Sequence, residues 1–353
     1  MNRLFGWKQT GVFLLALAAG ILPFAVPEVC AAALREGLTL CSGPLLLSLF
    51  PFLVVSRLLI QCPESDLLAL PFRLAAWGIG IRTPCAARVL CIGFLGGFAP
   101  AASAAAQAVR TGQLTAEEAD ALLPACICSG PSFVVLTVGQ SLLGSAELGV
   151  LLFASQITAN YLTAALLNRF AGVRSVKPES AAPASPAPPR LDEILADAAI
   201  TYCKLCGFIL FFRMLAAGAG ALLPAGAGTL CSILLEVCSG CDLASRTGRW
   251  GSLLCCAALS VQGLSVLLQV RTICPPEMTL RPLYRARMLH LPLSLALFYL
   301  LLPGGEADVF STLPARILLM RRVPPDCALL VFAVCCMAAC TLRSGIRQVE
   351  QKQ

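Results

Sequence analysis

The residues of this sequence that could do chemistry are small or polar, and they interrupt long apolar stretches. One such group lies at 97–107, where Gly97 and Pro100 precede a run of alanines, and a second is the string SGPS at Ser129. Glycine and proline break a membrane helix and free backbone groups that lipid cannot satisfy, so those groups must face protein or a water-filled cavity. Broken, polar segments inside an apolar bundle indicate the binding site of a transporter. The alternative is that the small residues only let helices pack closely.

The string at Ser129 is followed by an apolar stretch and predicts a helix that begins inside the membrane. Its exposed backbone N–H groups would bind an anion through the positive end of the helix dipole. Two glutamines, Gln262 and Gln269, follow later in the chain, and their spacing of seven places them on one helix face. They could hydrogen-bond a carboxylate or an amide of a solute, or they could join two helices.

Glu236 is an acidic residue in an otherwise neutral stretch, SILLEVCSG. A carboxylate within a membrane is costly and is by default a candidate for function. Glu236 could take up a proton for coupling or pair with a base such as Arg213, or it could lie at the interfacial end of a span. By contrast, we expect Glu117, Glu118 and Asp120 to lie in a polar loop where water solvates them.

Four broken segments, 97–107, 129–133, 236–241 and 260–265, share this small and polar character. We therefore predict that they converge in the middle of the membrane around one solute site. The candidate substrate-binding residues are Gly97, Pro100, Ser103, Gln107, Ser129, Gly130, Pro131, Ser132, Glu236, Ser239, Gly240, Gln262, Gly263, Ser265 and Gln269.

The composition excludes an ordinary soluble domain. The mean hydropathy is +0.82 and charged residues make up 13% of the 353 positions, about half the share of a soluble protein. Several uncharged windows are long enough to span a bilayer, and Pro23 and Pro27 argue against a signal peptide in the first. The expected spans are roughly 10–27, 38–61, 85–109, 121–145, 147–168, 194–223, 226–243, 250–271, 288–303 and 326–343. The predicted fold is an all-α polytopic membrane protein with two repeat-like halves, each with a broken or re-entrant helix.

A proline-rich linker at 171–190 separates the two membrane halves, 1–170 and 191–303, and a C-terminal segment, 304–353, carries a last span. The basic stretches 169–190 and 271–287 should lie in the cytoplasm, with the N-terminus, whereas 110–120 is acidic. In each half, three apolar segments then lie between two stretches of chain that should both be cytoplasmic. Because an odd number of crossings cannot return to the starting side, one segment of each three, the one rich in small residues, should be broken or re-entrant.

Enzyme, metal and nucleic-acid functions lack their usual residues. Most of the 19 cysteines lie in apolar runs, where they serve as small hydrophobic residues, and His290 is the single histidine, so a zinc site has no ligand set. The sequence has no GxSxG or phosphate-binding GK motif. The net charge of +7 is spread over loops and forms no nucleic-acid footprint. We expect no enzyme activity, no cofactor and no nucleic-acid partner.

At the broken segments the chain resembles the sporulation integral membrane proteins of the YlbJ type, which belong to the wider group with a nucleoside-recognition or gate domain. The resemblance implies export of dipicolinic acid from the mother cell toward the developing spore, across the outer forespore membrane. The matching strings keep their order over about residues 35–300: SLFPF at Ser48, GF and a small-residue run at Gly97, GQLTAEEADALL at Gly112, SGPSFVVLTVG at Ser129, EVCSG at Glu236 and GLSVLLQV at Gly263.

The chain also departs from the family pattern. Near Gly97 the family reads Gly-aromatic-Pro-x-Gly-Ala-basic, whereas here the proline is shifted to Pro100 and the basic residue is lost. Cys126 and Cys128 stand where the family has asparagines, and Gln262-Gly263 replaces a Gly-Gly pair. The lost basic residue removes an expected contact with an anion, so the identity of the substrate stays open.

The sequence therefore predicts a membrane transporter of a small polar or anionic solute, dipicolinic acid by resemblance. Two alternatives remain, which are a transporter of a nucleoside-like solute and a sporulation membrane scaffold that transports nothing. The expected partners are the lipid bilayer, the solute and a possible coupling proton or cation. The direction of transport and the oligomeric state stay open.

Overall fold

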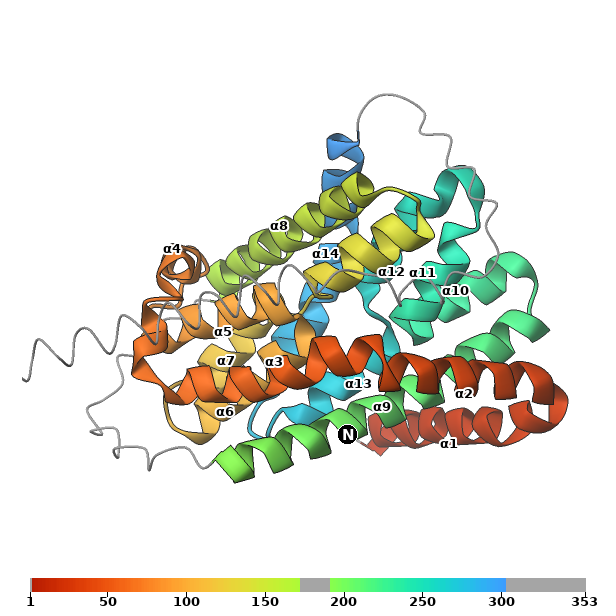
Figure 1. The fold of residues 1–353 in the computed structure, drawn as a ribbon, viewed down its shortest axis with the longest axis horizontal. Helices are drawn as coiled ribbons and strands as arrows, with labels where there is room; N and C mark the ends of the chain where they lie inside the picture. The colour runs from red at the N-terminus through yellow and green to blue at the C-terminus, as the bar shows by residue number, and fades with distance from the viewer. Residues whose placement is uncertain (1, 172–190, 303–353) are drawn as a thin grey trace, which may run out of the picture.

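The computed structural model describes residues 2–171 and 191–302, and every element in them is a helix (Figure 1). The predicted all-α class is confirmed. The linker and the predicted last span, 326–343, lie outside the described residues.

Four helical stretches are long and apolar enough to cross a membrane, and they are Pro27–Leu47, Ala146–Ala171, Leu191–Leu222 and Gly248–Ile273. Large apolar side chains such as Phe170 and Ile200 are exposed on them. Outward-facing apolar side chains on long helices need lipid around them. The chain is an integral membrane protein.

Most helices before the linker overlap the predicted spans, but the helix Pro27–Ser42 lies mainly between the first two, and the helix Leu70–Gly78 lies in none of them. In chain order, the elements before the linker are α1 (Asn2–Ala25), α2 (Pro27–Ser42), α3 (Pro44–Gln61), a short 3₁₀ turn (Pro63–Asp66), α4 (Leu70–Gly78), α5 (Pro84–Gly96), α6 (Phe98–Arg110), α7 (Ala116–Cys126), the π-helix η2 (Ser132–Leu142) and α8 (Ala146–Ala171). After the linker come α9 (Leu191–Leu222), α10 (Ala225–Leu235), α11 (Val237–Ser245), a 3₁₀ turn (Gly248–Trp250), α12 (Gly251–Val261), α13 (Gly263–Ile273) and α14 (Arg281–Leu301).

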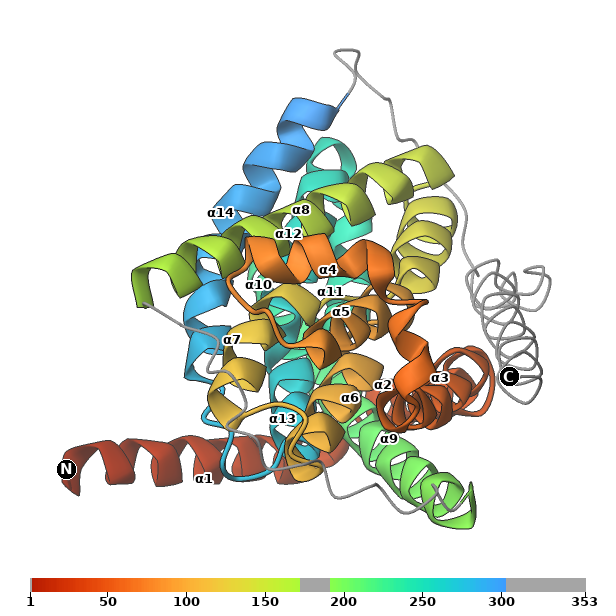
Figure 2. The same ribbon diagram turned by 90° about the vertical axis from the view of Figure 1, so that its left-hand side faces the viewer.

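Helices α5 and α6 form a hairpin that enters and leaves the bundle at one end. The chain reverses at Gly97, whose φ is +80°. At the open end of the hairpin, Thr83 donates a 2.6 Å hydrogen bond to Glu118, and Arg88 donates a 2.9 Å bond to the Gln113 side chain. The last turns of α8, just before the linker, lie at this same end of the bundle, which Figure 2 faces.

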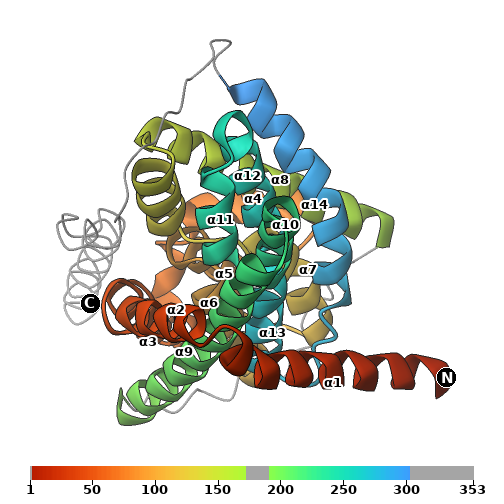
Figure 3. The ribbon, with the colours of Figure 1, turned by 90° about the vertical axis from the view of Figure 1, so that its right-hand side faces the viewer.

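Helices α10 and α11 form a second hairpin that enters from the opposite end, which Figure 3 faces. The break is at Glu236, and a Cβ placed on Gly240 would come within 2.8 Å of the Ile233 Cα, so the two arms are in contact. The first arm starts beside the end of α9, since a Cβ on Gly228 would lie 3.1 Å from the Gly220 Cα. Each half thus holds one hairpin in its small-residue segment, whereas the cytoplasmic side of the linker and the number of crossings stay predictions.

The other two broken segments, α7–η2 and α12–α13, run through the bundle instead of folding back. Asn168 near the end of α8 donates to the carbonyl of Ala121 at 3.1 Å, so α7 begins at the linker end. Helix α8 follows η2 and leads back to the linker end, and with 26 residues it is about 39 Å long. The η2 helix must end at the far side of the bundle. The order of broken elements is the same in both halves, but an internal repeat stays a prediction.

Helix α9 is tied to α2 and α3, with which it lies along one face in Figure 1. Arg57 of α3 pairs with Asp197 at 2.6 Å, and Arg213 of α9 pairs with Glu36 of α2 at 2.7 Å. Arg213 therefore forms its direct ion pair with Glu36 and not with Glu236, although Glu236 lies close enough for its charge to act on the Arg213 guanidinium.

The segment Arg110–Asp120 is not the solvated acidic loop that the sequence predicts. Glu118 and Asp120 are 4% and 6% exposed, and of the three acids only Glu117 is exposed. Glu118 closes a capping box with Thr115 at the start of α7. Asp120 accepts hydrogen bonds from the backbone N–H groups of Thr279 and Leu280 at 2.8 and 3.1 Å. Both carboxylates bind backbone and hydroxyl groups inside the protein, which is why burial is tolerated.

The turn at Gly97 generates a stability prediction. A Cβ at Gly97 would come within 2.7 Å of the Gly130 backbone N, whereas one at Gly112, whose φ is +70°, would meet nothing within 4 Å. We expect Gly112→Ala to cost about 1–2 kcal/mol from its backbone conformation alone. Gly97→Ala should lower the thermal unfolding midpoint much further, because it adds a backbone clash. Equal midpoints for the two variants in detergent would contradict the close crossing.

Candidate functional site

The four broken segments meet in two crossings of backbone against backbone. At the first, Gly97 of the α5–α6 hairpin lies against Gly130, between α7 and η2. At the second, Gly263 lies against Leu235 and Glu236, and a Cβ on it would come within 2.9 Å of the Leu235 carbonyl oxygen. Each hairpin tip therefore touches the break of a helix that runs through the bundle. The tip of one hairpin enters from the linker end and that of the other from the far end.

Arg287 of α14 joins the two through-running broken helices. Its Nη2 donates to the carbonyl of Ile127, just after α7, at 2.5 Å, and its Nη1 donates to the carbonyl of Ser260, in the last turn of α12, at 3.3 Å. Asn160 of α8 also donates to the Ile127 carbonyl, at 3.4 Å. These carbonyls lie at helix C-termini, where the helix breaks leave acceptors without intrahelical partners. A single guanidinium satisfies both.

No carboxylate among residues 2–171 and 191–302 neutralises the charge of Arg287. The residue is 7% exposed, it has no ion pair among the described residues, and its Nε has no hydrogen-bond partner there. The negative ends of the α7 and α12 dipoles stabilise the guanidinium in part. A buried cation nevertheless normally has an anionic partner, since isolated charge is costly in an apolar interior. Arg287 is therefore the strongest candidate for contact with an anionic solute.

A buried polar network surrounds this guanidinium. Gln156 of α8 donates to the Ser260 hydroxyl at 3.0 Å, and that hydroxyl also bonds the hydroxyl of Ser294. His290, one turn after Arg287, bonds the Gln156 carbonyl through Nε2 at 3.2 Å. Such networks are unusual in an apolar bundle, because every polar group in it must be satisfied.

Several polar atoms of the interior have no hydrogen-bond partner among the residues that the structure describes. They are Asn160 Oδ1, Thr163 Oγ1, Gln262 Oε1 and His290 Nδ1. Buried unsatisfied groups are rare in native proteins and usually mark a bound water, ion or ligand. Asn160 shares the Ile127 carbonyl with Arg287 and His290 lies one turn after it, so at least these two atoms are close to the guanidinium and support a polar solute site.

Gln262 also has an uncommon backbone conformation. It lies between α12 and α13 with φ +64°, in the left-handed region, and it is 1% exposed. A side chain in this region costs roughly 1–2 kcal/mol relative to the right-handed form. Such strain in a buried polar residue is typical of binding sites. The neighbouring Gly263 also has positive φ, +69°.

Glu236 lies at the second crossing, where its carboxylate begins α11. It accepts hydrogen bonds from the backbone N–H groups of Cys238 at 2.8 Å and Ser239 at 2.7 Å, and from the Ser239 hydroxyl at 2.9 Å. The residue is 3% exposed. The negative charge is thus held by the helix N-terminus. Its role in proton uptake stays a prediction.

The remaining predicted residues fall into three places. Pro100 packs beneath Gly96, and Gly240 lies in the α10–α11 contact, so both shape the hairpins. Pro131 and Ser132 begin η2 beside Ser129, close to the first crossing. Ser103 and Gln269 line the same cavity near the linker end. Ser265 accepts a hydrogen bond from Gln269 at 2.9 Å, and the Gln107 carbonyl accepts one from Thr111.

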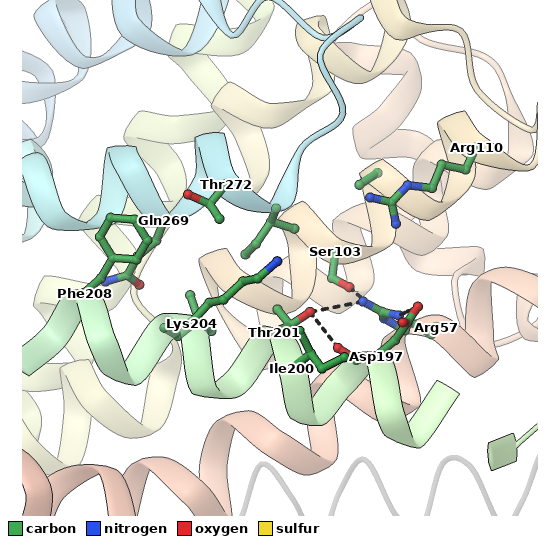
Figure 4. A pocket seen from close by; sticks show the side chains of 13 residues that line it. Arg57, Ser103, Arg110, Asp197, Ile200, Thr201, Lys204, Phe208, Gln269 and Thr272 are labelled. Atoms are coloured by element: carbon green, nitrogen blue, oxygen red, sulfur yellow. Dashed lines mark hydrogen bonds and ion pairs between the residues drawn. The ribbon is translucent and has the colours of Figure 1, made fainter. Parts of the chain in front are cut away.

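Ser103 and Gln269 line a separate cavity of about 140 Å³, which α3, α6, α9 and α13 enclose (Figure 4). Arg57 donates there to Ser103 at 3.3 Å and to the Thr201 hydroxyl at 3.2 Å. The predicted residues therefore do not form one site, because these two belong to a second, basic cavity.

The sequence analysis missed four residues of the candidate site, which are Arg287, Gln156, Asn160 and His290. Arg287 was assigned to the basic cytoplasmic stretch 271–287, whereas α14 begins at Arg281 and carries it into the bundle. A signal was present, because Arg287, His290 and Ser294 recur at intervals of three and four, which places them on one helix face.

No protein-family model, curated protein or solved structure matches this chain significantly. The functional conclusion must therefore come from the geometry of the site.

The cap at Glu236 gives a testable consequence. Glu236→Gln replaces one acceptor oxygen with a donor that opposes the N–H groups of Cys238 and Ser239. We expect a loss of about 1–2 kcal/mol in stability, as for other lost N-caps, and faster hydrogen exchange at those two amides. The matched control is Glu117→Gln, at an exposed position in the first turn of α7, which removes a charge at a helix N-terminus but no capping bond. Its stability should fall by less than that of Glu236→Gln, and exchange at Cys238 and Ser239 should be unchanged. Unchanged exchange in Glu236→Gln would show that the cap is dispensable.

Proposed function

We propose that this integral membrane protein transports a small anionic solute, and that the solute binds beside Arg287. The observation that carries the proposal is a buried guanidinium that is bonded to the carbonyls of two broken helices and has no carboxylate partner in the part of the chain that the structure describes. The unpartnered polar atoms around it are the groups that a bound solute would satisfy. A scaffold with no solute would gain nothing from so costly an arrangement.

The arrangement of the hairpins supports transport rather than simple binding. One hairpin reaches the interior from the linker end and the other from the far end, and each tip contacts a through-running broken helix. A movement of either tip would open a path from the site to one side of the membrane. Broken helices that meet at a central site are the common construction of secondary transporters.

Dipicolinic acid is the solute that the resemblance to the YlbJ-type proteins implies, in the outer forespore membrane. Its carboxylates would pair with Arg287, which takes the place of the basic residue lost near Gly97. A nucleoside-like solute is the second candidate, because the unpartnered oxygens of Asn160 and Gln262 are acceptors for N–H or O–H groups. Coupling to a proton or a cation belongs to the same proposal.

Uptake of radiolabelled dipicolinate into vesicles that contain the full chain tests the proposal, with and without a pH gradient. We expect Arg287→Gln to lower the initial rate, per folded protein, by about tenfold or more, since a charge-assisted hydrogen bond contributes about 1.5–3 kcal/mol. Arg287→Lys should retain part of the activity, because it keeps the positive charge but loses the planar, two-sided hydrogen bonding of the guanidinium. Arg285→Gln, at an exposed position two residues away, is the control.

The readout must separate a binding role from a structural one. The folded fraction is measured by size exclusion, and picolinate, which has one carboxylate, is compared with dipicolinate. A loss larger for dipicolinate supports a charge contact. Equal uptake by Arg287→Gln and wild type would refute the anion site, uptake of labelled nucleosides alone would favour the second candidate, and no uptake of any solute would favour a scaffold.

A further inference from the structure

The cavity at the linker end has the charge and shape of a second binding site, distinct from the interior around Arg287. It lies at the seam between the α3–α9 pair and the helices α6 and α13. Its lining includes three basic side chains, Arg57, Arg110 and Lys204, and one acidic side chain, Asp197. The excess of positive charge is two, since three minus one leaves two.

Arg57 is held in place at one wall of the cavity. The residue is 7% exposed, and it donates to Asp197, Thr201 and Ser103. Asp197 is the less firmly held side chain of this ion pair, because it is 61% exposed. An anion in the cavity would compete with this exposed carboxylate for a guanidinium that is already positioned.

The other two basic groups have no ion pair among the described residues. Lys204 of α9 and Arg110 at the end of α6 both extend toward the cavity from opposite sides, as Figure 4 shows. Like charges on opposite walls repel one another, and a negative ion between them would remove that repulsion. Both residues are exposed, so water screens most of this repulsion, and a bound anion would remove the rest.

A buried amide completes the lining. Gln269 is 2% exposed, its Nε2 donates to Ser265, and its Oε1 has no partner. Rotation of the amide by half a turn exchanges the two atoms, so that the Ser265 hydroxyl donates to Oε1 and the N–H group takes the unpartnered position. In that orientation Gln269 is an additional donor at the cavity.

We propose that this cavity binds an oxyanion, a carboxylate or phosphate group, between Arg57, Lys204 and Arg110. A volume of about 140 Å³ holds a group of roughly benzene size, which suits one phosphate or a small carboxylate. The source is either a free small anion or the headgroup of an anionic lipid, since basic pockets between membrane helices at a positively charged end bind such headgroups.

Equilibrium binding to the purified full chain in neutral detergent tests this, without any transport step. One arm uses radiolabelled inorganic phosphate, and the other uses a fluorescent short-chain phosphatidylglycerol with phosphatidylcholine as the neutral comparison. We expect Lys204→Gln to weaken binding about tenfold, and Asp197→Asn to strengthen it by a similar factor, because the competing carboxylate is gone. Arg285→Gln, which removes an exposed charge away from the cavity, should bind as wild type.

The opposite directions of the two changes are the decisive feature, because general destabilisation would weaken binding in both variants. Phosphate binding that changes in Lys204→Gln and Asp197→Asn reports this cavity, whereas binding that is lost only in Arg287→Gln reports the transport site, so failure of one site and failure of the other are distinguishable. Phosphate binding supports a free anion, and selective binding of phosphatidylglycerol supports a lipid headgroup. Absence of binding in both arms, or equal affinity in wild type, Lys204→Gln and Asp197→Asn, would overturn the proposal.

Discussion

Backbone groups freed where helices break inside the bundle are the constraint on which this structure depends. Lipid offers them no hydrogen bonds, so each break needs partners from the protein itself. The protein meets this need with one acidic and one basic side chain. The carboxylate of Glu236 accepts the N–H groups that begin α11, and the guanidinium of Arg287 donates to carbonyls at the ends of α7 and α12. Each charge also lies at the helix end whose dipole stabilises it.

The same constraint explains why the site is built largely from backbone. At the crossings Gly97 meets Gly130 and Gly263 meets Leu235, at separations that leave no room for a Cβ. Only glycine permits this approach, and the positive φ values at Gly97 and Gly263 restrict both positions further. Close packing of helix ends concentrates dipoles in the interior with few charged side chains. This accounts for a sequence that carries a polar site with so little charge.

The sequence predicted those features that depend on local composition. Apolar runs predicted the helices, and Gly, Pro and Ser predicted the breaks, because hydropathy and helix breaking depend on a few neighbouring residues. Features that depend on distant contacts were wrong or missed. Glu118 and Asp120 look solvated in sequence, but their partners are Thr83, 35 positions away, and Thr279, 159 positions away. Arg287 looked like a loop charge because the start of α14 was placed at 288 instead of Arg281.

The two basic regions differ in how their charge is compensated, and this difference has a consequence for binding. Arg57 is compensated by a carboxylate, so an incoming anion must displace Asp197 and gains only the difference between two ion pairs. Arg287 is compensated by the fixed carbonyls of two helix ends, which remain in place when an anion arrives. An environment of preorganised dipoles needs no rearrangement to accept charge. Under the two proposals, the interior is therefore the site suited to bind and release an anion repeatedly, whereas the linker-end cavity is the site suited to exchange one partner for another.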